Sequence, residues 1–485
     1  MTTSATRISR VVGVVRSVAG VAAVAALVTG CGSLLESDEL PPNVSDPAII
    51  ETPEGALAAY QGLLGRFREA LGGASDATGD AVFSFVAITG LLSDELQATD
   101  ATSEGESAAV DRRTTIEGQS NSVVGSAYAR LQKVRGQASQ AVGLLTRYAP
   151  PEQRALVGHV YALQAYAEVF LAELFCSGIP LSTLDYDGDY TLAPGSTTEQ
   201  VYHHALGLFG QALAVAADSV RFVHLARMGQ ARALLGLGRL AEAAAAAAQV
   251  PDGYRYAVAF HAAAELNARS FARQLMFSER PWELTVADRE GLNGLDYRAS
   301  DDPRTRATLL GTVGAVAIYH PDKYDLEGAT PIVLASDVEA RLIEAEAALR
   351  GAAGGDWLGI LNRLRTDGTF TTQPNPTDPG ATDTVWNAGT GGVPGLRPLD
   401  DPGDADARVD LLFRERAFWL FLTGHRQGDL RRLVRQYGRD PQALYPTGAY
   451  PASAGASYGT DVTLPIPPAE RMANPRFTGC ISRGA

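Results

Sequence analysis

The sequence predicts a mainly α-helical protein, in which tetratricopeptide-like helix pairs carry an irregular lobe rich in loops. Three observations predict it: apolar residues recur at three- and four-residue spacing in seven long segments, small residues and glycines meet at one helix turn, and three long stretches lack periodicity. The 485 residues exceed what one compact core usually holds. The net charge of -14 opposes binding to nucleic acid, because phosphates require clustered Lys and Arg.

The N-terminus predicts export and lipid attachment rather than part of the fold. Three arginines precede an apolar run at 18–28 that is too short to span a bilayer, and the run ends in small residues before Cys31. We therefore expect a lipoprotein signal peptide at 1–30, a lipid on Cys31 and a polar tether at 31–50. Gly32, rather than Asp, favours the outer membrane. The alternative is an ordinary secretory signal with an incidental cysteine.

The two remaining cysteines are Cys176 and Cys480. An exported chain matures in an oxidising compartment, where two leftover thiols tend to pair. This predicts a disulfide that ties the C-terminal tail to the end of a helix. Two buried free thiols are the alternative.

The helical period dominates the chain that follows, which we treat as one domain at 51–485. The periodic segments are 56–71, 123–145, 152–175, 198–217, 223–236, 240–249 and 335–350. Residues 231–244 place alanines and glycines where two antiparallel helices approach closely, as in a tetratricopeptide unit. Other helix pairs are expected at 158–175 and 338–365, so the array is imperfect.

Three segments at 178–197, 250–330 and 366–405 are expected to be long loops, and loops of this length are uncommon unless they have a function. Exposed aromatic rings on such loops can stack against sugar rings or peptide side chains. The alternative is that the aromatics pin the loops to the helices. The candidate ligand-binding residues are Tyr186, Tyr190, Trp282, Tyr297 and Trp386.

Acidic residues at 185–189 have the spacing of oxygen ligands in a calcium loop, but the distal Glu of such a loop is missing. A solvated turn is the favoured interpretation, and no metal or other cofactor is expected.

The segment 411–433 carries charges among large apolar residues, which predicts partly buried ion pairs. A helix is expected to end at Gly424, and a second helix to begin after it. The residues of this structural ion-pair clasp are Glu415, Arg416, Arg426, Asp429 and Arg432. The alternative makes Glu415 and Asp429 an acid and base pair in an active site.

The same residues carry a family resemblance. Glu-Arg at 415–416, Gly-x-Arg-x-x-Asp-Leu-x-Arg at 424–432 and Leu-Pro-Ile-Pro-Pro-Ala-Glu at 464–470 resemble the closing signature of the SusD/RagB family. Earlier segments at 152–181 and 331–346 resemble the family's long helix and its glutamate-rich helix. Two residues depart from the pattern, since Trp419 and Thr423 stand where Glu is common.

The resemblance implies a SusD-like superhelical scaffold with four helix pairs, and a non-enzymatic role. Proteins of the family sit as lids on TonB-dependent β-barrel transporters in the outer membrane. A SusC-like barrel is thus the implied partner, and an oligosaccharide or peptide is the implied ligand, captured at the cell surface and delivered to the barrel. Tethering to one complex makes the transfer effectively intramolecular.

Two other classes of function are weighed against capture. An anchored hydrolase finds little support, because no His-Glu-x-x-His or Gly-x-Ser-x-Gly motif occurs in the sequence. A helical-repeat scaffold for a protein partner would share the array, but it would not need three long aromatic-bearing loops.

Overall fold

The computed structural model describes residues 47–73, 84–99, 105–184, 189–260, 284–314, 316–324, 330–375 and 378–485. The predicted signal peptide and Cys31 lie outside these ranges, as do Tyr186 and Trp282. The predicted tether overlaps the described residues only at its end, where α2 (Pro47–Ile50) begins.

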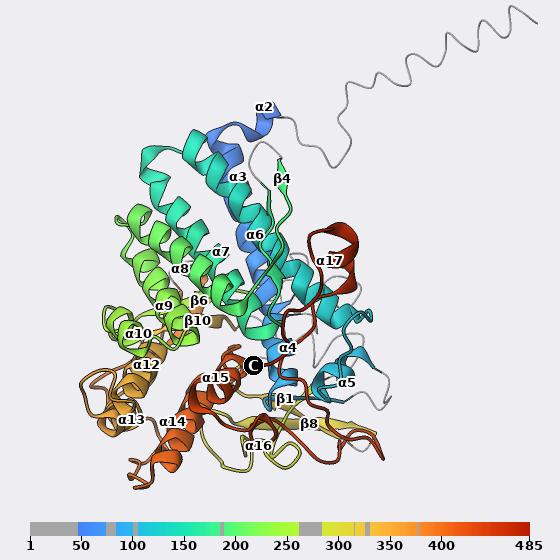
Figure 1. Cartoon of the computed structure of the whole chain (residues 1–485). Helices are drawn as coiled ribbons and strands as arrows, with labels where there is room; N and C mark the ends of the chain where they lie inside the picture. Colours follow the sequence, from blue (N-terminus) through green and yellow to red (C-terminus); the bar gives the residue numbers. More distant parts are fainter. Residues whose placement is uncertain are drawn as a thin grey trace, which may run out of the picture.

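Long helices pack against their neighbours in chain order and form one curved layer of antiparallel hairpins (Figure 1). The helices of this layer are α3 (Pro53–Gly72), α6 (Ser122–Tyr148), α7 (Arg154–Leu174), α8 (Thr198–Val215), α9 (Val220–Gly236), α10 (Leu240–Ala247), α12 (Asp337–Leu349) and α13 (Trp357–Thr366). Taken two by two, they make the four tetratricopeptide-like pairs, and the predicted fold class is confirmed.

Helix α7 lies at the centre of the layer and contacts α6, α8 and α9. It passes the length and hydropathy criteria for a membrane span over Pro151–Leu174, but 78% of its most apolar window is buried inside the protein. A helix that is apolar on most sides is the core helix of a large α-helical array. Gly158 lets α8 approach closely, because a Cβ atom there would lie 2.6 Å from the Cβ of Ala216.

Antiparallel strand pairs occur in all three segments that were expected to be irregular loops, although the strands at 96–98 and 332–336 lie outside them. The prediction missed them because several have only two or three residues, and because Thr, Gly and Pro hide any alternation of apolar residues in the longer ones. The pairs are β1 (Leu96–Ala98) with β7 (Leu284–Val286), β2 (Ile179–Pro180) with β5 (Gly195–Ser196), β3 (Thr183–Leu184) with β4 (Tyr190–Thr191), β6 (Arg255–Val258) with β10 (Ile332–Ser336), β8 (Ala307–Val313) with β9 (Val316–Pro321), and β11 (Thr369–Asn375) with β12 (Asp378–Asn387).

The lobe below the helical layer contains the β1–β7 and β8–β9 pairs and further helices (Figure 1). Its helices are α4 (Phe85–Leu92), α5 (Glu106–Asp111), α14 (Ala405–Trp419), α15 (Arg426–Tyr437) and α16 (Pro441–Leu444), and α17 (Pro468–Ala473) lies near the C-terminus. Helix α15 contacts both α4 and α7. The last helices of the chain therefore connect the lobe to the centre of the helical layer.

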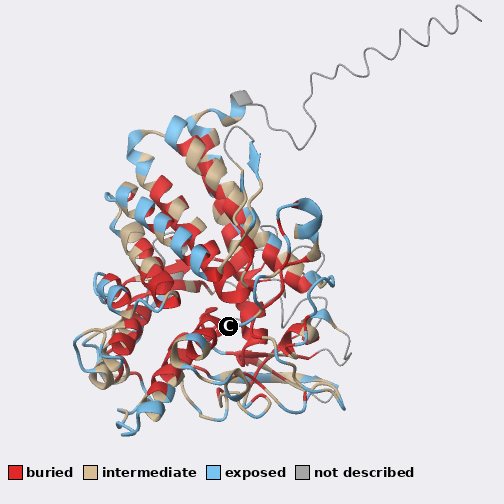
Figure 2. Ribbon diagram, viewed as in Figure 1, coloured by how far each residue is buried: buried red, intermediate tan, exposed pale blue. Residues whose placement is uncertain are grey.

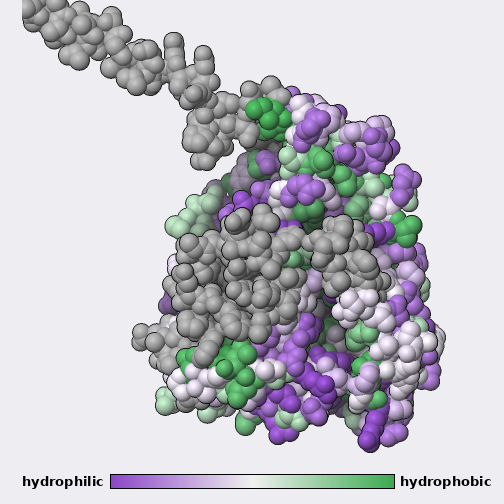
Figure 3. All heavy atoms as spheres, turned by 180° about the vertical axis from the view of Figure 1, so that it is seen from behind, coloured by the Kyte–Doolittle hydropathy of each residue, from purple (hydrophilic) through white to green (hydrophobic). Residues whose placement is uncertain are grey.

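The buried apolar residues fall into two clusters. The larger one follows α3 to α10 and reaches the start of the lobe, and the smaller one lies among α12, α13, α14 and α15. Figure 2 shows the buried residues along the inward faces of these helices. On the face turned to the viewer in Figure 3, hydrophobic residues are scattered among hydrophilic ones over the described part of the surface.

Candidate functional site

The link between α14 and α15 is a tight turn that several buried groups hold in place. Leu422 adopts a positive φ of 52°, its N–H donates to Glu95 Oε1 at 2.8 Å, and its carbonyl accepts from the Tyr324 hydroxyl at 2.7 Å. Gly424 has a φ of 78°, and a Cβ atom there would lie 2.6 Å from the Phe85 ring. Only glycine fits this position without strain.

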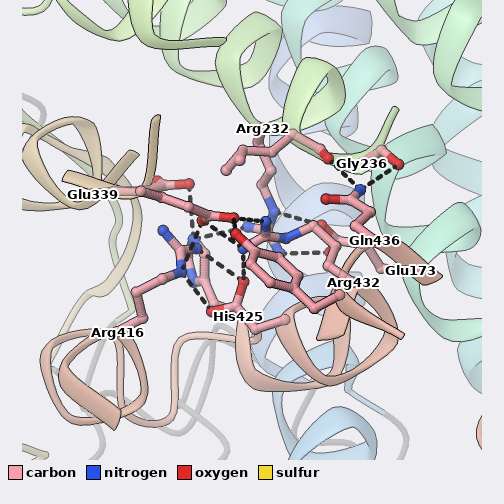
Figure 4. Close-up of polar contacts among 12 residues, drawn as sticks. Glu173, Arg232, Gly236, Glu339, Arg416, His425, Arg432 and Gln436 are labelled. Atoms are coloured by element: carbon pink, nitrogen blue, oxygen red, sulfur yellow. Dashed lines mark hydrogen bonds and ion pairs between the residues drawn. The ribbon is translucent and has the colours of Figure 1, made fainter. Parts of the chain in front are cut away.

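Three of the predicted clasp residues meet between α14 and α15 (Figure 4). Arg416 donates to both oxygens of Asp429 at 2.8 and 2.9 Å, and Arg432 donates to Asp429 Oδ1 at 2.8 Å and to Glu346 Oε2 at 3.0 Å. Burial alone would raise the pKa of Asp429, but the two guanidinium groups outweigh it and hold that pKa well below its usual range. The pairing therefore favours the ionised form of Asp429.

A second cluster adjoins the first and joins α7, α9 and α12 to the turn (Figure 4). Arg232 binds Glu173 through two nitrogens, at 2.8 and 2.6 Å, and donates to Gly424 O at 2.8 Å. His425 Nε2 lies 3.0 Å from Arg232 Nη1 and 3.2 Å from Glu339 Oε1. Because all these side chains are buried, their ion pairs hold helices from distant parts of the chain in register.

The other two predicted clasp residues pair with the lobe and with α13. Arg426 binds both oxygens of Asp94 at 2.7 and 2.9 Å. Glu415 accepts from Arg304 at 2.8 and 3.1 Å and from Arg365 at 2.7 Å. Glu415 and Asp429 are each engaged by two arginines, which fits their prediction as members of a structural ion-pair clasp.

Sequence reasoning missed the partners of these charges. They lie far away in the chain, at Asp94, Arg304, Glu346 and Arg365, and so do Glu173, Arg232 and Glu339 of the second cluster. Local spacing reveals only pairs within one helix, such as Asp429 with Arg432. The glutamate-rich character of 331–346 was the one signal that pointed to two of them.

A cavity of about 420 Å³ lies beside the clasp, between the start of α12, the β11–β12 hairpin and the end of α14. His425 and Glu339 belong both to its wall and to the buried cluster. Trp419 and Thr423, the two residues that depart from the family pattern, also line it. A glutamate in place of Trp419 would lie near Glu415 and would remove an aromatic wall.

Trp419 is held in a fixed orientation at this cavity. Its indole N–H donates to Glu415 Oε2 at 3.2 Å, and the Arg304 guanidinium lies 4.9 Å from its ring centroid. Phe370 of the hairpin lies 6.0 Å away, centroid to centroid. Trp386 lines the same cavity and donates its N–H to Leu364 O at 3.1 Å, which fixes the base of the hairpin.

The predicted ligand-binding aromatics have different positions. Tyr297 is 0% exposed, packs on Phe418 and Phe421, and donates to Asp94 at 3.4 Å, so its prediction as an exposed ligand-stacking residue is wrong. Burial of its ring in the lobe core is the physical reason. Trp386 is also buried, but it faces the cavity. Tyr190 on β4 is 62% exposed and remains a candidate.

Cys176 and Cys480 form a disulfide across 304 residues of sequence. Backbone bridges flank it on both sides, between Phe175 and Leu464 and between Ser177 and Ser482. The C-terminal tail therefore runs along the end of α7.

Within the described ranges, no group of three or more His, Cys, Asp or Glu side chains is arranged to hold a metal ion. Residues 185–188 of the possible calcium loop lie outside those ranges.

No family model and no curated protein matches this sequence. Solved structures do match over nearly the whole chain. A SusD superfamily protein from Bacteroides thetaiotaomicron has a TM-score of 0.61 at 14% identity, with 89% of this chain and 100% of that chain covered. NanU from B. fragilis has a TM-score of 0.60 at 14% identity, with 92% and 100% covered.

A third structure, the surface glycan-binding protein A from Bacteroides thetaiotaomicron, has a TM-score of 0.59 at 13% identity, with 89% and 100% of the two chains covered. At these identities the comparisons bear on the fold. They agree with the sequence signature at 415–470 and with the array of helix pairs. This chain has the fold of the SusD superfamily, as the resemblance in its sequence implied.

Proposed function

We propose that this chain is a cell-surface binding protein, which captures a nutrient glycan and delivers it to a TonB-dependent transporter in the outer membrane. The observation that carries the proposal is the cavity walled by Trp419, Trp386 and Phe370 on a SusD-like fold. Ligand sites in proteins are concave, mostly apolar and equipped with a few polar groups, and this cavity has that character. One structure of the same fold is named a surface glycan-binding protein.

The proposed role requires binding without chemistry. The two carboxylates that sequence reasoning weighed as an acid and base pair are engaged by arginines in the structure. Aromatic rings and hydrogen-bonding groups are enough to hold a sugar or, in the alternative form of the proposal, a peptide. Tyr186, Tyr190 and Trp282 are kept as proposed ligand contacts, separate from the residues that line the cavity.

The N-terminal segment supplies the attachment in this proposal. Signal cleavage at 1–30 and a lipid on Cys31 would leave the folded chain on a short tether at the membrane surface. Capture followed by transfer within one complex then raises the local concentration of the glycan at the barrel entrance.

The test is a pulldown of the lipid-anchored protein from its native outer membrane after gentle solubilisation, with co-purifying chains identified by mass spectrometry. The expected result is a large TonB-dependent barrel in near-equal amount. The matched control is Cys31→Ser, which removes the predicted acylation site and should abolish membrane recovery. An abundant anchored protein without any barrel would refute the transporter role, and a different stoichiometric partner would favour a helical scaffold.

A further inference from the structure

The cationic side chains on the cavity wall are directed at the protein itself. Arg304 donates to Asp302 Oδ1 at 2.9 Å and to Glu415 Oε2 at 2.8 Å. Lys323 donates to the carbonyl of Phe421, and Arg255 donates to the carbonyl of Thr384 at 2.6 Å. An anionic ligand group is usually held by a guanidinium that presents two N–H groups to it. In this cavity, each of these three side chains donates at least one N–H to an acceptor of the protein itself.

The start of α12 faces the same space, and its donors are also engaged. The Glu339 N–H donates to Ser336 Oγ at 3.3 Å, and the Val338 N–H donates to Asp337 Oδ1 at 2.8 Å. A helix N-terminus attracts anions through its free N–H groups and its dipole. Here two carboxylates, Asp337 and Glu339, occupy the first turn and line the cavity. These two carboxylates would repel an anionic group of a ligand.

Aromatic residues line the same cavity, and Trp419 is preorganised. The hydrogen bond from Trp419 to Glu415 fixes the indole before any ligand arrives, so little side-chain freedom is lost on binding. Phe370 is 43% exposed and lines the cavity from the β11–β12 hairpin. The cavity lining therefore combines aromatic side chains with the carboxylates of Asp337 and Glu339. Asp337 accepts from the N–H groups of Val338 and Gly253, and Glu339 lies 3.2 Å from His425. Because a carboxylate has about four acceptor positions, acceptors for hydroxyl groups remain on both side chains.

We infer that the cavity binds one uncharged sugar ring of the captured glycan, with the C–H face of the ring on Trp419 and hydroxyl groups donating to Glu339 and Asp337. This inference rests on the proposed function, because it names the class of ligand for the same site. An uncharged pyranose offers both features that the walls require: an apolar face, and several hydroxyl donors at its edge. A uronic acid or a sulfated sugar places a negative charge beside two carboxylates.

The inference is tested with matched probes in saturation-transfer NMR on the full mature chain. The neutral probes are the methyl pyranosides of glucose, galactose and mannose, and the charged probes are the methyl glycosides of glucuronic and galacturonic acid. We expect saturation of ring protons in at least one neutral glycoside at millimolar concentration. The matching uronide should bind about tenfold more weakly or not at all.

Two variants and a control place the binding in the cavity. Trp419→Ala should weaken the neutral glycoside about tenfold, as expected for truncation of a central aromatic contact. Phe370→Ala should weaken it as well, and its partly exposed side chain makes this variant the safer one for folding. Trp357→Ala, on α13 and outside the cavity lining, should bind as the unmodified protein does. Circular dichroism verifies that each variant is folded.

A uronide that binds more tightly than its neutral partner overturns the inference. So does neutral-glycoside binding that survives in folded Phe370→Ala and Trp419→Ala variants, or a panel in which no neutral pyranoside binds. The barrel pulldown is read separately. A recovered barrel with a failed panel rejects the neutral-ring inference and leaves capture standing, and a missing barrel rejects delivery to a transporter whatever the panel shows.

Discussion

Replacement of Asp429 by Asn tests the claim that the buried clasp stabilises the fold. Asp429 accepts three hydrogen bonds, two from Arg416 and one from Arg432, and is 4% exposed. After the change, Arg432 keeps Glu346, but Arg416 keeps only a contact of 4.0 Å with that carboxylate. One buried guanidinium is then left without a close counter-charge. We expect a loss of about 3–5 kcal/mol in the free energy of unfolding.

The assay is equilibrium urea unfolding, followed by far-UV circular dichroism and by tryptophan fluorescence in parallel. The control is Asp410→Asn, because Asp410 pairs with Arg439 at 3.0 Å on the surface, where its side chain is 66% exposed. Such a pair contributes about 0–1 kcal/mol. A loss for Asp429→Asn that is no larger than the loss for Asp410→Asn would refute the reasoning. A total stability of about 5–15 kcal/mol makes the expected difference easy to measure.

Three further predictions concern other buried groups. Burial raises the pKa of Asp111 to about 6 and the pKa of its neighbour Glu290 well above its usual value of 4.5. The stability that these groups provide is therefore present below about pH 4 and is lost as pH rises through 6. Asp111→Asn should flatten this loss in urea titrations at pH 4 and 8, and an unchanged dependence of stability on pH would contradict the prediction. Cys176→Ser with Cys480→Ser should lower the unfolding free energy by at most about 5 kcal/mol, measured beside the oxidised protein, and equal stability of the two would contradict a role for the bond. Trp386→Ala should loosen the β11–β12 hairpin and speed its cleavage by a protease, which mass spectrometry of the fragments measures. A cleavage rate equal to that of the unmodified chain would show that other contacts hold the hairpin.

Helix pairs were predictable from the sequence because apolar periodicity is a local property. The segment 152–175 contains α7 almost residue for residue, and 198–217 contains α8 with its capping residues one position earlier. The hairpin at 369–387 was not predictable, because its strands are rich in Thr, Pro and Asp and show no clear alternation. Tertiary contacts such as that of Trp386 with Leu364 hold it in place.

The candidate site was predictable only in part. The charged residues at 415–432 were recognised as buried, since charges among large apolar side chains need partners. Their partners were not identified, because residues such as Asp94 and Arg304 are distant in sequence and nothing local marks them as partners. Trp419 was noticed only as a departure from a pattern, and its place at a cavity depends on how α14 meets the hairpin.

The long-range ties of the C-terminal region also set the order in which the molecule can be completed. Asp94 can form its ion pair only after Arg426 is synthesised, 332 residues later, and Cys176 can form its disulfide only after Cys480, 304 residues later. While the chain is still emerging, the apolar surface of α7 has no cover from α15 or the tail. Contacts of such long sequence separation slow folding. These contacts therefore form only after Cys480 and the residues beside it have been synthesised. Removal of the tail would destabilise the packing of α7 at the centre of the helical layer.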